Sequence, residues 1–556
     1  MFTRIKNFGL MGTFALFMLI LAACQPQIVE VVTTRDESTD MAADAQYESE
    51  EIVVIEPVEV EREVELVQEV EVMEEIEEES EYYEEVVSEP QATQVAQIIS
   101  EEELPEDMMF EDVGTNPFID TRDDNLSTFA IDVDTGSYTV MRRYLNDGLL
   151  PPSESVRVEE YINYFNHQYP YPQDAAFGIH LEAAPAPYGE SEEYHLLRVG
   201  IQGYDVPANE RPDGLFIFLV DVSGSMSSGN RMGLVKESLR MLTYNLRDTD
   251  RIGIVTYGDT AQTVLVPTDA GNEMDILAAI DRLQTAGGTN MDGGIAMAYR
   301  LAGEYAREGE INRIILASDG VGNIGATAAE EILRNAEEGI QLSTFGFGMG
   351  NYNDHGMEQL ANQGDGTYAY IDDLDEAERV FNDQLTATIF TIAKDAKIQI
   401  EFNAAVVERY RLIGYENRDV ADNDFRNDAV DAGEIGAGHA VTALYEVRFA
   451  GDAPANEVAV TARMRYANMD DGEVTELEKS MSFGDAHESF TDASTTFQLD
   501  AVVVEYAEIL GRSFWAHDAA LADIVIDARR IAEYLPDDAD VQEFASMVAQ
   551  AAELYE

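Results

Sequence analysis

An unbroken apolar run that leads directly into a carboxylate and two hydroxyls constrains the fold of this chain more than any other feature. The run covers residues 215–220, and Asp221, Ser223 and Ser225 follow it. Such a run indicates a buried strand, and in an open α/β sheet ligands bind beyond the carboxyl ends of the strands. A carboxylate and two hydroxyls on a tight turn are hard oxygen donors, which suit Mg²⁺, Mn²⁺ or Ca²⁺ rather than Zn²⁺ or Cu²⁺. The segment therefore predicts a divalent-cation site at one edge of a sheet.

Residues 213–386 alternate predicted strands with predicted helices. We expect strands near 215–221, 252–257, 262–266, 312–318, 341–347 and 367–371, and helices near 230–246, 273–284, 292–307, 327–338, 354–362 and 374–385. Regular alternation of this kind predicts an α/β fold with a doubly wound, mostly parallel, Rossmann-like sheet that helices cover on both faces.

The segments on either side of this region predict two smaller modules. Residues 114–205 read as an α+β module, with a strand and turn near 126–138, strands near 177–184 and 194–203, and helices near 139–146 and 156–167. Residues 390–556 read as a module that is β-rich and then helical. Its strands are expected near 396–402, 441–449, 457–466 and 474–483, and its helices near 494–511, 519–532 and 540–554.

The first 24 residues have the pattern of a secretory signal. Arg4 and Lys6 precede an apolar stretch that is short for a membrane span, and the segment ends Leu21-Ala22-Ala23-Cys24. This ending resembles the bacterial lipobox, in which the cysteine is lipidated, and Cys24 is the only cysteine of the chain. The alternative is a signal peptide or anchor helix with an incidental cysteine. We expect a lipid-anchored, extracytoplasmic protein of the cell envelope. It would lie on the outer membrane of a Gram-negative cell, or otherwise on the outer face of the cell membrane.

Residues 25–113 predict a disordered acidic tether. They hold roughly thirty acidic residues against Arg35 and Arg62 as the only basic ones, and such charge density opposes collapse. The Val/Glu alternation within the tether leaves an edge strand as the alternative. The whole chain has a formal net charge of −75. A surface this acidic repels nucleic acid and anionic lipid, so we expect no nucleic-acid partner and contact with the membrane through the anchor alone.

Two further segments bring oxygen donors towards the predicted cation site. Thr289 lies in Gly287-Gly288-Thr289-Asn290, just before a predicted helix, and Asp319 follows the strand expected at 312–318. Both segments lie in loops that can reach the carboxyl edge of the sheet. The alternative for the whole set is a Ser/Gly-rich turn that holds no metal.

The set Asp221, Ser223, Ser225, Thr289 and Asp319 resembles the von Willebrand factor type A domain and its metal-ion-dependent adhesion site. The resemblance implies that both serines bind the metal directly and that Thr289 does so when a ligand is present. It also implies that the two aspartates act largely through water. With few carboxylates bound directly, the ion keeps positive charge and an open position for an acidic group. Mg²⁺ is the expected cation, with Mn²⁺ and Ca²⁺ as alternatives.

The wider chain resembles a family of bacterial lipoproteins that place an N-terminal module before a type A domain and an uncharacterised module after it. The resemblance rests on Asn116-Pro117-Phe118, on the segment 128–138 and on the segment 160–165. On the five-residue site and the lipobox together, we expect an adhesion or scaffold protein that engages an Asp or Glu side chain of a protein partner. A metal-dependent hydrolase of the envelope is the alternative function.

Catalytic motifs are weak in comparison. The seven histidines form no zinc-protease motif, and we find neither a nucleophile elbow nor a phosphate-binding loop, so we expect no enzyme. His355 is read as a surface histidine at a helix start rather than as a base. Asp132 and Asp134 leave two interpretations open, a Ca²⁺ site or a strand end with an Asx-type turn. We also hypothesise that the acidic tether supplies a carboxylate to the metal site in cis.

Overall fold

The computed structural model describes most of the chain from residue 113 onwards. The described residues are 113–131, 134–189, 193–320, 339–348, 354–451, 453–469, 472–517 and 519–555, together with Phe110 and Leu333. The predicted signal segment and nearly all of the predicted tether lie outside them. Within the described part, no helix combines the length and the apolar character that crossing a membrane requires.

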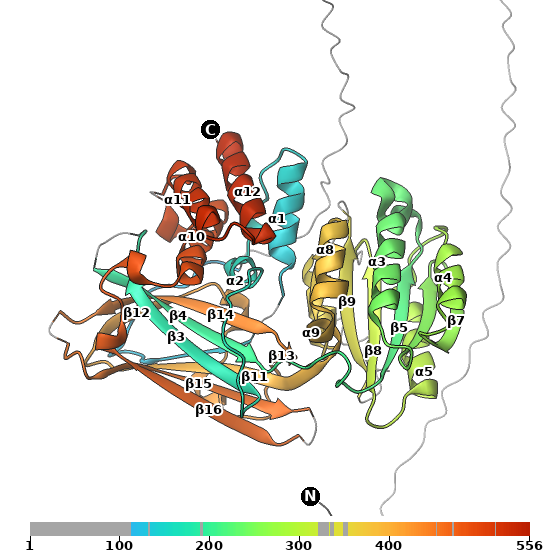
Figure 1. Ribbon diagram of the computed structural model, residues 1–556, viewed down its shortest axis with the longest axis horizontal. Helices are drawn as coiled ribbons and strands as arrows, with labels where there is room; N and C mark the ends of the chain where they lie inside the picture. The colour runs from blue at the N-terminus through green and yellow to red at the C-terminus, as the bar shows by residue number, and fades with distance from the viewer. Residues whose placement is uncertain are drawn as a thin grey trace, which may run out of the picture. The chain divides into compact units, whose positions relative to one another are not determined.

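A six-stranded sheet forms the centre of residues 214–371 (Figure 1), in the order β10-β9-β8-β5-β6-β7. Every neighbouring pair is parallel except β6 and β7, which are antiparallel. The predicted doubly wound, mostly parallel sheet is therefore confirmed. Its strands are β5 (Gly214–Asp221), β6 (Arg251–Tyr257), β7 (Gln262–Asp269), β8 (Ile311–Ser318), β9 (Gln341–Phe347) and β10 (Tyr368–Ile371).

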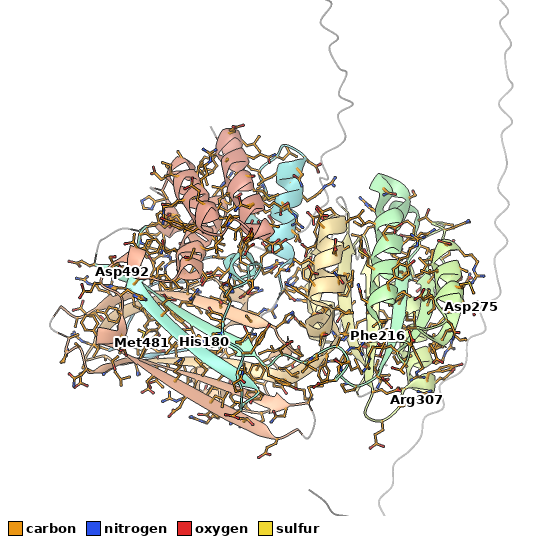
Figure 2. The ribbon with its side chains drawn as sticks, viewed as in Figure 1. His180, Phe216, Asp275, Arg307, Met481 and Asp492 are labelled. Atoms are coloured by element: carbon orange, nitrogen blue, oxygen red, sulfur yellow. The ribbon has the colours of Figure 1, made fainter. Side chains whose placement is uncertain are left out.

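Helices cover both faces of this sheet, which explains the unbroken apolar sequence of β5. Leu215, Ile217 and Leu219 pack on one face with α5 (Met291–Tyr305) and α7 (Asp354–Asn362). Successive side chains of a strand point to opposite faces, so the alternate residues of β5, among them Phe216 (labelled in Figure 2), pack on the other face. That second face is covered by α3 (Arg231–Asn245), α4 (Glu273–Asp281), α8 (Leu374–Glu378) and α9 (Leu385–Ile389).

The flanking segments share two further sheets. The first has the order β1-β12-β14-β4-β3, and the second has the order β13-β11-β15-β16 with β2 also paired to β11. The strands are β1 (Ile119–Asp120), β2 (Leu126–Ala130), β3 (Phe177–Pro185), β4 (Tyr194–Gly203), β11 (Thr391–Phe402), β12 (Val407–Ile413), β13 (Gly433–Gly436), β14 (Ala440–Phe449), β15 (Val458–Asn468) and β16 (Val474–Ser482). One apolar cluster joins the two sheets.

This pairing corrects the expectation of two separate flanking modules. Strand β4, from the segment 114–205, lies between β3 and β14, and β14 comes from the segment 390–556. Likewise β2 pairs with β11 over five residues, from Ala130 against Lys397 to Leu126 against Glu401. The two segments fold together because each sheet takes strands from both.

A group of helices packs on the first of these sheets. They are α1 (Gly136–Asn146), α2 (Val158–Ile162), α10 (Thr495–Leu510), α11 (Leu521–Tyr534) and α12 (Ala539–Tyr555). Their apolar side chains form one cluster with Leu196 of β4 and Leu444 of β14. The helix expected at 156–167 is shorter than predicted. It ends at Ile162, and the next residue, Asn163, faces the sheet, where its Oδ1 accepts from the Thr442 backbone N–H at 2.8 Å.

Several charged side chains are buried where α10 crosses β12 and β14. Arg411 on β12 donates from Nε to Glu446 at 2.7 Å and from Nη1 to Glu508 at 2.7 Å. Glu505 lies beside them. Burial, together with the charges of Glu508 and Glu446, raises the pKa of Glu505 to about 8 against the opposing effect of Arg411. The folded chain therefore favours the neutral form of Glu505.

Glu505→Gln is expected to stabilise the chain at alkaline pH and to change little near pH 5. The pKa of Glu505 is about 8 in the folded chain, against 4.5 in the unfolded chain. The stability that the bound proton contributes is therefore fully present below pH 4.5 and is lost as the pH rises through about 8. We expect a gain of about 2 kcal/mol at pH 9, measured by urea denaturation. Exposed Glu378 provides the control, and Glu378→Gln should give no such gain. Equal stability of wild type and Glu505→Gln at pH 9 would contradict the buried neutral form.

Candidate metal centre

Asp221 ends strand β5 and is completely buried. Its Oδ1 accepts from the Ser223 backbone N–H at 2.7 Å, and its Oδ2 accepts from the Ser318 hydroxyl at 2.9 Å. Burial raises the pKa of Asp221, while the hydrogen bonds from Ser223 and Ser318 lower it and the nearby charge of Asp319 raises it further. The carboxylate is thus held in one orientation at the start of the turn.

The two serine hydroxyls and Asp319 are linked in series by two hydrogen-bond contacts. Ser223 Oγ is 3.0 Å from Ser225 Oγ, and Ser225 Oγ donates to Asp319 Oδ1 at 3.0 Å. Ser223 is buried and Ser225 is exposed, so the group opens to solvent on one side. Because β5 and β8 are parallel neighbours, their carboxyl ends bring Asp221 and Asp319 to the same edge of the sheet.

Thr289 lies on a loop that is bonded to the turn after β5. The Ala286 backbone N–H donates to the Val222 carbonyl at 2.6 Å, and the Gly224 backbone N–H donates to the Gly287 carbonyl at 3.1 Å. Thr289 itself is exposed. The structure thus groups four of the predicted residues directly and places the fifth on an adjoining loop. Their role as metal ligands stays a prediction.

Asp259 and Ser318 belong to the site but were not anticipated from the sequence as residues that shape it. Asp259, just after β6, accepts from the Gly288 backbone N–H at 2.7 Å and so holds the Thr289 loop. Gly287 has a φ of 85°, and a Cβ there would lie 2.6 Å from the Asp259 carboxylate, so the loop needs glycine at this position. Ser318 orients Asp221. The position of Asp259 at the carboxyl end of a predicted strand was the one available signal.

Arg231, the first residue of α3, places a positive charge at the edge of the site. Its Nη1 donates to Asp319 Oδ2 and to the Ser225 carbonyl oxygen, the latter at 3.2 Å. Gly348 makes room for it, because a Cβ on Gly348 would lie 2.4 Å from Arg231 Nε. No motif predicts this residue, since its contact with Asp319 spans 88 positions of sequence.

Arg231→Ala is expected to tighten Mg²⁺ binding about tenfold, because it removes a like charge beside the cation and frees an oxygen of Asp319. Isothermal titration of wild type and variant with Mg²⁺ measures the change. Arg231→Lys keeps the charge and should bind close to wild type. If Arg231→Ala binds more weakly, the guanidinium serves to hold Asp319 in place and does not compete with the ion.

Asp134 and His355, two further candidates from the sequence, have structural partners. Asp132 lies outside the described residues. The carboxylate of Asp134 accepts from the Tyr368 backbone N–H at 3.0 Å and lies 3.5 Å from Arg418, which favours the structural reading over a Ca²⁺ site. His355 contacts Gln359 one turn along α7 at 2.7 Å.

Comparison with protein families agrees with this architecture. Residues 216–383 match the von Willebrand factor type A domain, and residues 387–554 match the family described as "Uncharacterized protein YfbK, C-terminal". Residues 104–198 match a model described as "von Willebrand factor". The chain therefore contains a type A domain followed by a YfbK C-terminal domain, and the predicted type A domain is confirmed.

Similar proteins include the "Uncharacterized protein YfbK" of Escherichia coli, to which the chain is homologous, with 42% identity over 63% of this chain and 62% of that protein. The human "Inter-alpha-trypsin inhibitor heavy chain H4" is 29% identical over 34% of this chain and 23% of that protein. Among solved structures, a von Willebrand factor type A protein from Catenulispora acidiphila aligns with a TM-score of 0.39 and 17% identity. That alignment covers 62% of this chain and 81% of that one. The chain spans less than two thirds of the length of either curated relative.

Proposed function

We propose that this chain binds a protein partner through a divalent cation held by Asp221, Ser223, Ser225, Thr289 and Asp319, with an Asp or Glu of the partner completing the coordination. The type A domain is typically a protein-interaction module. One observation carries the metal: the two serine hydroxyls and Asp319 lie 3.0 Å apart in series, at the edge of the sheet where ligands of such folds bind.

The spacing of these oxygens supports Mg²⁺ as the cation. Mg²⁺ binds oxygen at about 2.1 Å in an octahedron, which places neighbouring ligand oxygens about 3.0 Å apart. Ca²⁺ binds oxygen at longer distances, so its ligand oxygens would lie farther apart. In this proposal Ser223 and Ser225 are direct ligands, and Asp221 holds the Ser223 backbone in place. The bound cation would act as a Lewis acid for a carboxylate oxygen of the partner.

We favour recognition over hydrolysis as the function, because of the contacts that the two carboxylates make. Hydrolysis at a metal needs a base close to the attacking water. Asp221 is held by Ser223 and Ser318, and Asp319 is held by Ser225 and Arg231. These contacts suit carboxylates that position hydroxyls and balance charge rather than remove protons.

The proposal includes an extracytoplasmic location. The lipobox at Cys24 would attach the chain to an envelope membrane, and the acidic tether would separate the folded part from the lipid surface. Cys24→Ser should move the protein from the membrane fraction to the soluble fraction. Retention of Cys24→Ser in the membrane fraction would contradict the lipid anchor.

Affinity capture from envelope extracts tests the function, with purified chain as bait in Mg²⁺ or in EDTA. A partner should be retained in Mg²⁺ and lost in EDTA, and Ser225→Ala should lose it in both. Ser227→Ala is the matched control, since Ser227 is a neighbouring exposed serine whose hydroxyl donates to the Gly224 carbonyl at 2.7 Å. Equal retention by wild type and Ser225→Ala would refute the role of the site.

A further inference from the structure

A second group of carboxylates gathers away from the predicted site. One carboxylate oxygen each of Asp365, Asp431 and Glu434 can be chosen so that all three lie within 4.8 Å of one another. Asp365 precedes β10 of the type A sheet. Glu434 lies in β13, and Asp431 lies in the loop before that strand. Asp395 of β11 is close enough to raise the pKa of Asp431 and of Glu434. The group therefore joins the type A sheet to a flanking sheet.

Glu434 distinguishes this group from an ordinary acidic surface. Its side chain is 6% exposed, and its carboxylate faces those of Asp365 and Asp431. In the described part of the chain, no residue donates a hydrogen bond to that carboxylate. The nearby guanidinium of Arg313 donates instead to Ser343, Gln341 and Thr391, at 2.6, 2.7 and 2.8 Å. A buried carboxylate without a donor is costly unless it is neutralised.

The backbone brings these side chains together through an irregularity in β11. The pairing of β11 with β15 shifts between Lys394 and Lys397, and Asp395 in the shift has a φ of 54°. Bulges of this kind redirect side chains from the regular faces of a strand. Asp395 is thereby placed beside Asp431, in the loop before β13.

Formal charge leaves the group short of one positive charge. Four carboxylates face three cationic groups, since Arg313 acts on Glu434, Lys394 acts on Asp365 and Lys397 acts on Asp395. Burial, followed by the charges of Asp365, Asp431 and Asp395, raises the pKa of Glu434 well above its ordinary value. Bound protons or one divalent cation would neutralise this excess negative charge.

We propose that Asp365, Asp431 and Glu434, with Asp395 beside them, form a Ca²⁺ site that braces the type A sheet against strands β11 and β13. Asp365 and Asp431 are exposed, so an ion can enter from solvent. Only oxygen donors are present, which selects a hard cation, and Ca²⁺ accepts irregular arrangements of carboxylates that Mg²⁺ does not. The proposal is independent of the centre at Asp221.

Thermal unfolding of the full chain in Ca²⁺ and in EDTA tests this site. The measurements use the Ser225→Ala background, so that the centre at Asp221 contributes no metal response. Ca²⁺ at a hundredfold excess over its dissociation constant should raise the Tm by about 5 °C. Glu434→Gln should abolish the rise while leaving the chain folded and no less stable in EDTA. Asp431→Asn, at an exposed position, should weaken Ca²⁺ binding about tenfold.

Glu478→Gln is the matched control, because Glu478 is a 70% exposed carboxylate on β16, and it should keep the full Ca²⁺ response. A Ca²⁺-dependent rise that survives Glu434→Gln would overturn the site. A chain that Ca²⁺ does not stabilise, and that gains stability only as pH falls, would show that protons neutralise Glu434 and would likewise overturn the proposal. An equal rise with Mg²⁺ would overturn the assignment to Ca²⁺.

Discussion

Asp221→Ala is expected to lower the affinity of the chain for Mg²⁺ by about 100-fold. The variant removes a carboxylate near the cation and also the acceptor that holds the Ser223 backbone N–H at 2.7 Å. Loss of an orienting partner in a metal site typically costs 10- to 100-fold in affinity, and the lost charge adds to this. Isothermal titration with Mg²⁺ measures the change, and Mg²⁺ should no longer raise the Tm of the variant.

The control for this prediction is Ser227→Ala, which alters the same turn without touching a proposed ligand. It should bind Mg²⁺ with wild-type affinity. Circular dichroism should show that Asp221→Ala remains folded, because its Ser318 partner keeps a second contact with the Gly320 carbonyl at 2.9 Å. An affinity for Mg²⁺ that Asp221→Ala leaves within threefold of wild type would mean that the cation binds elsewhere.

Arg142→Met is expected to destabilise the fold by about 3–5 kcal/mol, because it leaves the buried Asp372 carboxylate without its cation, although Glu376 keeps its pair with Arg379 at 2.6 Å. Arg142, on α1, donates to Asp372 at 2.6 and 2.8 Å and to Glu376 at 2.9 Å. The side chains of Asp372 and Glu376 are 1% and 0% exposed. Both follow β10, so this arginine fastens the N-terminal segment to the type A domain. Urea denaturation measures the loss.

Arg143→Met provides a matched control for this experiment on the same helix. Arg143 pairs with Asp147 at 3.1 Å, but both side chains are 41% exposed, and such pairs contribute less than about 1 kcal/mol. The double variant Arg142→Met/Asp372→Asn should recover part of the loss, because it removes the buried charge that Arg142→Met leaves unpaired. If Arg142→Met and Arg143→Met are equally stable, the buried network does not hold the segments together.

The strands of the type A domain could be predicted closely from the sequence, whereas the helix expected at 327–338 lies outside the described residues apart from Leu333. Strands that are buried on both faces have continuous apolar runs, and β5, β6, β8 and β9 all fall within one or two residues of their expected positions. Strand β12 was missed, because the buried Arg411 within it reads as an exposed residue until Glu446 and Glu508 are placed beside it. The sharing of sheets between flanking segments was also missed, since β4 and β14 are paired across more than 200 residues.

The residues of the candidate site likewise include some that the sequence could predict and some that it could not. Asp221, Ser223 and Ser225 lie in one short motif, and Asp319 directly follows a clearly predicted strand, so sequence reasoning could place them together. Arg231 and Asp259 could not be found by spacing, because each acts through a contact with a distant loop. The Ca²⁺ group was invisible for the same reason, as Asp365 and Glu434 meet only when two sheets are assembled.

Water-proton relaxation of the chain loaded with Mn²⁺ tests the central claim most directly. Mn²⁺ at the Asp221 site should keep an exchangeable water, which a carboxylate can displace. The difference in relaxivity between wild type and Asp221→Ala isolates this site from weaker sites elsewhere on the acidic chain. We predict that a glutamate-containing peptide at millimolar concentration lowers this difference and that the matching glutamine peptide does not. No difference between wild type and Asp221→Ala, or an equal effect of the two peptides, would contradict a cation site built to receive an acidic group.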